Sequence, residues 1–293
     1  MINIKKYFKK LELNSFTIIF FIALTLYTCV MVFMLAWILM TTFKWFDEFI
    51  DYPLNFPKRV SIDNYKYVWD HLYVTNSVTR ERIYVEGMFG NSLFYALGCA
   101  TVQVIVCSIT AYATSMFKFK FSEVVYGVVI VCMALPIVGS LPSEIRIVTG
   151  IGLDGSILGM FVLKANFLGM YYMIFHAMFS SIPQSYAEAA KIDGAGNFTI
   201  MLKIYYPLCF NVLFTVWLLY FITYWNDYQT LLLYCKENPT IALGLYLFKG
   251  KQENTVPHSM AAAMLVFIPI FTVFLIFRKR IMSQISMDGG VKG

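Results

Sequence analysis

Only a few side chains in or near the apolar stretches of this chain could do acid–base chemistry. They are Lys164, His176 and Asp227. An enzyme site needs a nucleophile, an acid–base pair or a metal set that faces one cavity, and the spacing of these three residues forms no such constellation. The histidines are scattered and no HExxH pattern occurs. We therefore expect no catalytic residues, no metal site and no cofactor site in this chain.

Nucleotide-binding patterns are equally uninformative. The chain has no GxxxxGK[ST] loop, so it cannot bind ATP in that way itself. Residues 150–155 spell GxGxxG, but a dinucleotide site requires a strand before this pattern and a helix after it, inside a βαβ unit. Here a proline-broken apolar stretch precedes the pattern and another apolar stretch follows it. We interpret these residues as an external turn.

Side chains suited to binding a sugar occur at two places. Residues 223–229 read Thr-Tyr-Trp-Asn-Asp-Tyr-Gln, and carbohydrate recognition combines flat aromatic faces with a few well-placed polar groups. Lys164 falls near the middle of an apolar stretch, where a charge costs on the order of 2.5–3.5 kcal/mol on membrane-insertion scales. It should therefore face a watery path, the bundle interior or a carboxylate. The candidates for the solute path are Lys164, Asn166, Tyr224, Trp225, Asn226 and Asp227.

Each candidate also has an alternative explanation that the sequence leaves open. The aromatic cluster could be an interfacial belt that packs between helices. Lys164 could form an interhelical ion pair, or it could reach the membrane surface by snorkelling if its helix starts later.

The composition indicates which elements must position these residues. The chain has 293 residues, of which 59% are hydrophobic and 14% charged, with a mean hydropathy of +0.66 and a net charge of +6. A soluble domain is nearer half apolar and a quarter charged. We therefore predict an all-α, polytopic membrane protein. The six cysteines show no metal-binding spacing, and we interpret them as small apolar side chains.

Apolar runs predict six transmembrane helices. They lie at about 16–41, 91–115, 124–143, 156–179, 209–233 and 259–277. Basic residues before the first helix and after the last place both termini in the cytoplasm. Residues 1–88 would form a basic arm, the first helix and a partly structured external loop at 44–88. Residues 89–280 would form the transmembrane core, with a short external helix near 241–245, and residues 281–293 a cytoplasmic tail.

A polar island at residues 180–208 separates the fourth and fifth predicted helices. Ser181 and Gln184 are spaced as a capping box for a first short helix, and Asn197 could cap a second. Between them, the glycines of residues 193–196 end the first helix, because glycine readily takes a positive φ. The resulting helical hairpin at 181–207 suits a knob for insertion into a partner's groove. The alternative is an amphipathic hairpin that lies on the membrane surface.

The hairpin resembles the EAA loop of ABC importer permeases, the coupling helix that docks on a cytoplasmic ATPase. The resemblance is carried by Glu188-Ala189-Ala190, then Asp193-Gly194-Ala195 two residues later, then Ile204-Tyr205-Tyr206-Pro207 eight residues after that. The family usually ends in Ile-x-Leu-Pro, so Tyr206 departs from it. The final residues, 289–293, are similar to the family's Gly-Ala-Val-Lys-Gly ending, which implies a contact with the ATPase.

This resemblance covers about residues 91–293 and points to the carbohydrate-uptake branch, in particular the second permease of maltose-type transporters. It implies a type I ABC importer permease fold in a bacterial cytoplasmic membrane. It also implies a transport subunit that is not itself an enzyme, because ATP and Mg²⁺ are used by the partner ATPase. The residues to which the resemblance assigns ATPase coupling are Glu188, Ala189, Ala190, Asp193, Gly194, Ala195 and Gly196.

The partners implied by the resemblance are a second homologous permease, two copies of the ATPase, an extracytoplasmic solute-binding protein and membrane lipid, with no nucleic acid. The solute stays open, because phosphorylated polyols and other glycosides use similar permeases. An ion-coupled transporter would need paired carboxylates within the spans, which are almost free of them. An intramembrane enzyme would need the catalytic constellation that is missing here.

Overall fold

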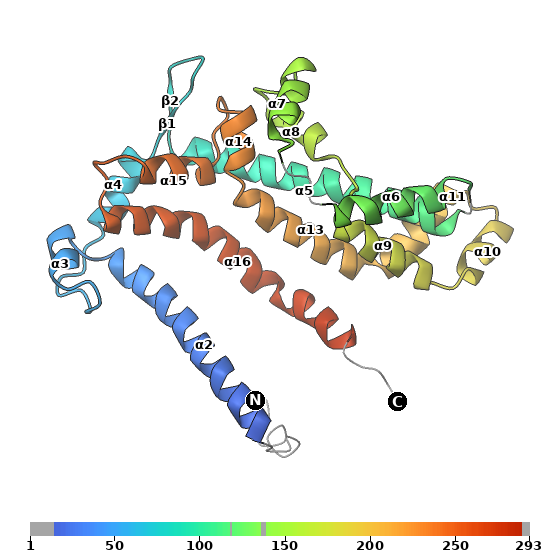
Figure 1. Cartoon of the computed structure of the whole chain (residues 1–293), viewed down its shortest axis with the longest axis horizontal. Coiled ribbons are helices and arrows are strands. Elements are labelled where there is room, and N and C mark those ends of the chain that lie inside the picture. The colour runs from blue at the N-terminus through green and yellow to red at the C-terminus, as the bar shows by residue number, and fades with distance from the viewer. Residues whose placement is uncertain (1–14, 118, 136–138, 289–293) are drawn as a thin grey trace. The chain divides into compact units, whose positions relative to one another are not determined.

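The computed structural model describes residues 15–288 except 118 and 136–138, and most of these residues are helical (Figure 1). The prediction of an all-α fold is therefore confirmed. The strands in the described part of the chain form one antiparallel pair, β1 (Val74–Thr75) with β2 (Arg82–Ile83). The basic arm and the final residues 289–293 lie outside the described residues, so the predictions made for them stay predictions.

Several helices can cross a membrane. In the described part of the chain, three segments are long and apolar enough: Phe16–Thr41, Val85–Met116 and Val256–Arg278. A fourth is obtained if Asn197–Leu208 and Phe210–Trp225, which meet at an angle of 81°, are counted as one broken span. The chain is thus a membrane protein, and the count of six spans stays a prediction.

One compact unit comprises the chain up to Val68 together with Gln252–Met264. Its loop after the first long helix is ordered by polar contacts around Lys44, which is fully buried. The Lys44 Nζ donates to the carbonyl oxygens of Tyr52 and Pro53 at 2.9 and 3.0 Å. The expectation of a partly structured loop is therefore confirmed. The first long helix is α2 (Ser15–Thr41), and the loop after it contains the short helices α3 (Phe46–Asp51) and α4 (Asp63–His71).

The second compact unit, Trp69–Lys251 with Leu265–Gly293, is built on the long helix α5 (Val85–Met116). Helices α9 (Met170–Ser181) and α13 (Phe210–Trp225) both pack along it (Figure 1). Small residues on α5, such as the fully buried Ala96 and Ala100, allow these neighbours to come close. This packing fixes the positions of the segments that carry the candidate residues.

The predicted fourth and fifth spans are broken, in addition to the third. The fourth was expected to be continuous, and that expectation is wrong. Helix α8 (Ile157–Lys164) ends at Lys164, and α9 begins only at Met170, after a stretch in which Asn166 and Gly169 are weak helix formers. The predicted fifth span divides into α13 and α14 (Gln229–Tyr234), with Asp227 in the gap between them.

The Asp227 carboxylate accounts for the second break. It accepts hydrogen bonds from the backbone N–H of Thr230 at 3.0 Å and from its hydroxyl at 2.6 Å. A carboxylate that satisfies free N–H groups in this way starts a new helix rather than continuing the old one.

The remaining segments follow the sequence more closely. The predicted third span corresponds to α6 (Ser122–Ala134) and then α7 (Leu141–Gly150). The GxGxxG stretch at residues 150–155 runs from the last residue of α7 into a turn before α8, with positive φ at Gly152 and Gly155, so the expected turn is present. The short helix expected near residue 241 is α15 (Ile241–Lys249), and α16 (Val256–Asp288) is the last helix.

Candidate functional site

The polar island forms two helical segments around a tight turn, as predicted. Helix α10 (Ser185–Ile192) has Asp193 at its C-cap position, and the next residue, Gly194, has a φ of 80°. The N–H of Ala195 donates to the carbonyl oxygen of Ala190 at 2.9 Å, and the N–H of Gly194 donates to that of Lys191 at 3.0 Å. These two bonds form a Schellman motif, which requires a left-handed residue at the position of Gly194. Gly194 is therefore required for the conformation of the turn.

The local capping predictions were wrong. Ser181 does not cap α10, because its hydroxyl donates back to the carbonyl oxygen of Met178 at 2.7 Å. The cap position is Gln184, whose side chain makes no capping bond. Asn197 is the first residue of α11 (Asn197–Ile200), and Gly196 occupies the cap position before it. The glycine turn, not side-chain caps, thus sets the ends of the two helices.

The second arm of the hairpin continues from α11 through a π-helical turn, Met201–Tyr205, into α12 (Tyr206–Leu208). The Tyr206 hydroxyl lies 2.8 Å from the hydroxyl of Ser108 on α5. This contact gives a physical reason for the departure from the expected Ile-x-Leu-Pro pattern, since a leucine could not make the bond. The tyrosine ties the hairpin to the membrane helix behind it.

The hairpin has an inner and an outer face. Ala187, Ala190 and Ala195 are partly buried against the core of the second unit. The other residues assigned to coupling are exposed, and they are Glu188, Ala189, Asp193, Gly194 and Gly196. The alanines thus allow the hairpin to lie close to its own chain, whereas the acidic residues and glycines point outward.

Large apolar side chains add to the outer face, and the sequence reading missed them. Ile192 is 87% exposed, Phe198 66% and Tyr186 53%. Their signal was present in the sequence, because apolar residues in a polar island are candidates for an exposed contact surface. Together with the exposed coupling residues, these three side chains form a surface that we call the hairpin tip.

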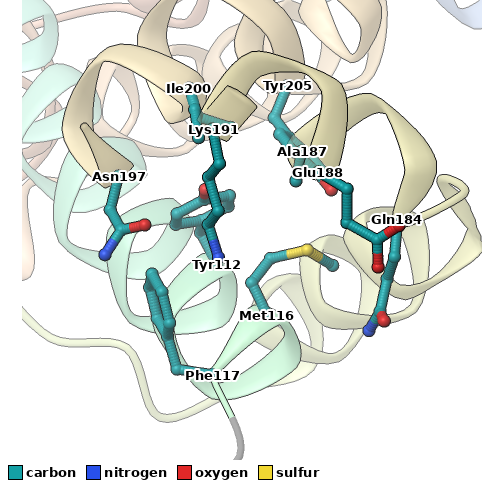
Figure 2. Close-up of a pocket in the computed structure, with 10 residues that line it drawn as sticks. All are labelled: Tyr112, Met116, Phe117, Gln184, Ala187, Glu188, Lys191, Asn197, Ile200 and Tyr205. Atoms are coloured by element: carbon teal, nitrogen blue, oxygen red, sulfur yellow. The ribbon is translucent and has the colours of Figure 1, made fainter. Parts of the chain in front are cut away.

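A hollow of about 110 Å³ lies between α10 and the end of α5. Figure 2 shows Glu188 and Lys191 of the hairpin around it, opposite Met116 and Phe117. The hydroxyl of Tyr205, which also lines the hollow, is buried and has no hydrogen-bond partner in the described part of the chain. The first arm of the hairpin is therefore packed through small alanine side chains, and the second arm through large ones, Ile200, Met201 and Tyr205.

A second cluster forms where the two broken spans meet. The Lys164 Nζ lies 3.4 Å from Asp227 Oδ2 and donates to the Thr230 hydroxyl at 2.9 Å. The Tyr95 hydroxyl donates to the same carboxylate oxygen at 2.9 Å. Of the alternatives for Lys164, the structure thus contains the interhelical ion pair. Paired charges cost much less in a membrane protein than single ones.

This polar cluster extends through uncharged groups. The Tyr224 hydroxyl donates to Gln103 Oε1, and Gln103 Nε2 lies 3.5 Å from Asn166 Oδ1. The Lys164 ammonium lies 5.6 Å from the centre of the Tyr224 ring, close enough for a cation–π interaction. Four of the six predicted path residues are therefore neighbours. Gln103 was missed, although a lone amide in an apolar helix was a usable signal.

The other two predicted path residues lie apart from this network. Trp225 is only 1% exposed, and its indole N–H donates to the carbonyl oxygen of Val266 at 3.1 Å. Its ring meets that of Phe89 edge-on, with centroids 5.4 Å apart. Asn226 is exposed and donates back to the carbonyl oxygen of Ile222. The position of Trp225 favours the packing interpretation of this residue.

Long apolar helices, an exposed polar hairpin and a polar cluster between broken spans define a membrane transport subunit. The sequence comparison agrees with this class. Residues 103–286 match the family described as binding-protein-dependent transport system inner membrane component, and the chain belongs to this family.

The similar curated proteins include sugar permeases. The chain is 26% identical over 242 residues to the melibiose/raffinose/stachyose import permease protein MelC of Bacillus subtilis, covering 81% of this chain and 83% of MelC. It is 26% identical over 249 residues to the maltodextrin permease protein MdxG of the same organism, covering 83% and 84%. It is also 26% identical over 269 residues to the sulfoquinovosyl glycerol permease protein SmoH of Agrobacterium fabrum, covering 88% and 87%.

A solved structure shows the same fold. The chain superimposes with a TM-score of 0.74 on a chain of a bacterial ABC transporter involved in the import of the acidic polysaccharide alginate. The match covers 90% of this chain and 96% of the other, at 21% sequence identity. The prediction of a type I ABC importer permease fold is thereby confirmed.

Proposed function

We propose that this chain is the permease subunit of an ATP-binding-cassette importer that forms half of the translocation path for a carbohydrate. The sugar permeases among its relatives support the class of solute. In this proposal a second permease, two cytoplasmic ATPases that use ATP and Mg²⁺, and an external solute-binding protein complete the complex. Residues 1–88 form the basic arm, the first helix and the external loop. Residues 89–280 form the transmembrane core and residues 281–293 the cytoplasmic tail, with both termini in the cytoplasm.

The hairpin tip is the observation that carries the coupling role. It projects acidic residues, glycines and three large apolar side chains whose exposure would otherwise be unfavourable. An exposed apolar patch rimmed by charge is typical of a protein–protein contact. We assign its partner as the ATPase, which would press on the segment from Glu188 to Gly194 when it closes on ATP.

The movement of the hairpin is the link to the solute path. Since the bonds within the turn are backbone hydrogen bonds, the tip would move as one piece rather than deform. The helices α9 and α13, which flank it in the sequence, would pass the movement to the polar cluster around Asp227. The hairpin tip and the polar cluster are then two separate sites linked by a coupling free energy. Damage to the tip therefore uncouples ATP hydrolysis from transport.

The test is uptake by the reconstituted complex. The tagged chain is purified from membranes, and the proposal expects an ATPase and a second permease to accompany it. Glu188→Lys should abolish ATP-driven sugar uptake while the complex still inserts, because it reverses the charge on the exposed tip. Glu81→Lys, an equal change at an exposed residue outside the hairpin, is the control. Normal uptake by Glu188→Lys, or a chain that purifies without any ATPase, would contradict the proposal.

A further inference from the structure

The two breaks in the predicted fourth and fifth spans meet at a single place. Lys164 is the last residue of α8, and Asp227 lies in the gap between α13 and α14. Non-helical backbone at membrane depth is tolerated only where it is buried in protein or lines a water-filled cavity. In membrane transporters, helices that are interrupted within the membrane commonly mark the place where the solute binds. The meeting point is therefore a candidate for direct contact with solute.

The position of the cluster along the helices indicates which end of the path it occupies. Helix α13, with 16 residues, separates Asp227 from the hairpin, which is about 24 Å at 1.5 Å per residue. The hydrocarbon core of a bilayer is about 30 Å thick. If the hairpin faces the cytoplasm, as proposed above, the cluster lies toward the outer end of the path. A solute delivered from outside meets this end first.

The charges of the cluster cancel within it. The Lys164 and Asp227 side chains are 23% and 16% exposed, and each is the other's partner at 3.4 Å. Lys164 also donates to the Thr230 hydroxyl, and Asp227 also accepts from the hydroxyl and the backbone N–H of Thr230 and from the Tyr95 hydroxyl. The neighbouring groups, the amides of Asn166 and Gln103 and the Tyr224 hydroxyl, carry no charge. Of these groups, the exposed amide of Asn166 and the partly exposed, mutually paired Lys164 and Asp227 are the ones that a solute could reach, and together they carry no net charge.

We propose that the Lys164–Asp227 pair is a selectivity element. It favours the passage of uncharged sugars through this half of the path and disfavours that of acidic sugars. The inference rests on the proposed function and adds the class of solute to it. An acidic sugar would need a cation that is free to pair with its carboxylate, and here the ammonium is already paired with Asp227. Asn166, which is exposed, offers its amide to sugar hydroxyls instead.

The experiment removes one charge at a time. Uptake of raffinose and of a digalacturonate is measured in proteoliposomes that hold the complete complex with its solute-binding protein, and both probes are supplied at the same concentration. The measured quantity is the ratio of uncharged to acidic uptake. Asp227→Asn frees the Lys164 ammonium. The matched control is Asp154→Asn, which removes a carboxylate from the exposed turn before α8.

The wild-type complex should take up the uncharged probe at least tenfold faster than the acidic one, and Asp227→Asn should lower this ratio at least fivefold. The control Asp154→Asn should retain the wild-type preference. A structural role alone would slow both probes equally, so an unchanged ratio in Asp227→Asn would overturn the inference while leaving the permease function intact. If no solute is taken up with ATP by the wild-type complex, the proposed function itself is overturned.

Discussion

The turn of the hairpin permits a sharp test, because two glycines close in sequence differ in backbone conformation. Gly194 has a φ of 80°, whereas Gly196 has a φ of −73°, and a Cβ at either position meets nothing within 4 Å. Steric crowding therefore cannot distinguish the two alanine variants. Only the left-handed backbone at Gly194 penalises a side chain.

The magnitude follows from the backbone conformation. An alanine in a left-handed conformation costs about 1–2 kcal/mol. An alanine that replaces glycine at an ordinary φ stabilises by about 0.4–1 kcal/mol, because it restricts the unfolded chain. The effect on the unfolded chain is common to both variants, so Gly194→Ala should be less stable than Gly196→Ala by the left-handed penalty alone, about 1–2 kcal/mol. Gly194→Pro should abolish uptake, since it also removes the N–H that donates to Lys191.

The assay compares ATP-driven uptake and protease resistance of the hairpin in the two alanine variants, with membrane insertion as a check on folding. Gly194→Ala should lower uptake and make the hairpin easier to cleave, and Gly196→Ala should behave as the wild type. If both variants behave alike, the Schellman turn does not determine the function of the hairpin, and the reasoning from its backbone is refuted.

Other substitutions test the packing that positions the sites. Trp225→Ala should destabilise the protein by about 3–5 kcal/mol and weaken uptake while the ATPase stays bound, because it empties a filled interior position; thermal unfolding and co-purification measure this. Gly159→Ala should disrupt α8, since its Cβ would strike the backbone of the preceding turn, whereas Gly90→Ala has free space inside α5 and should unfold slightly above the wild-type temperature. Tyr206→Phe should cost about 1 kcal/mol in thermal unfolding through the lost bond to Ser108.

The hairpin was predictable from sequence because its signals are local. Gly194 determines the turn through its own backbone conformation, and the small alanine side chains allow the hairpin to lie close to the rest of the chain. The capping predictions failed for a local reason as well, since Ser181 has a nearer acceptor in the preceding turn. Short polar side chains often choose between such alternatives, and the sequence does not indicate which one prevails.

The polar cluster was only partly predictable. Lys164 and Asp227 were singled out separately, each as a charge in an apolar stretch, but their pairing depends on residues 63 positions apart in the chain. The breaks that bring them together were missed, because the apolar composition of both stretches reads as continuous helix. Tyr95 and Gln103 lie on α5; the amide of Gln103 in an apolar helix was a usable signal, whereas nothing in the sequence singled out Tyr95.

The central claim is that the hairpin tip receives mechanical work from an ATPase, and the most direct measurement is site-specific photocrosslinking at Ala189. This side chain is exposed on the hairpin tip, and a photoreactive residue there leaves Glu188 and Gly194 in place. The account predicts a covalent product with the ATPase subunit, formed in intact membranes and altered in yield when ATP is bound. Crosslinks to lipid alone, or labelling of position 189 by a reagent confined to the outside of the cell, would contradict it.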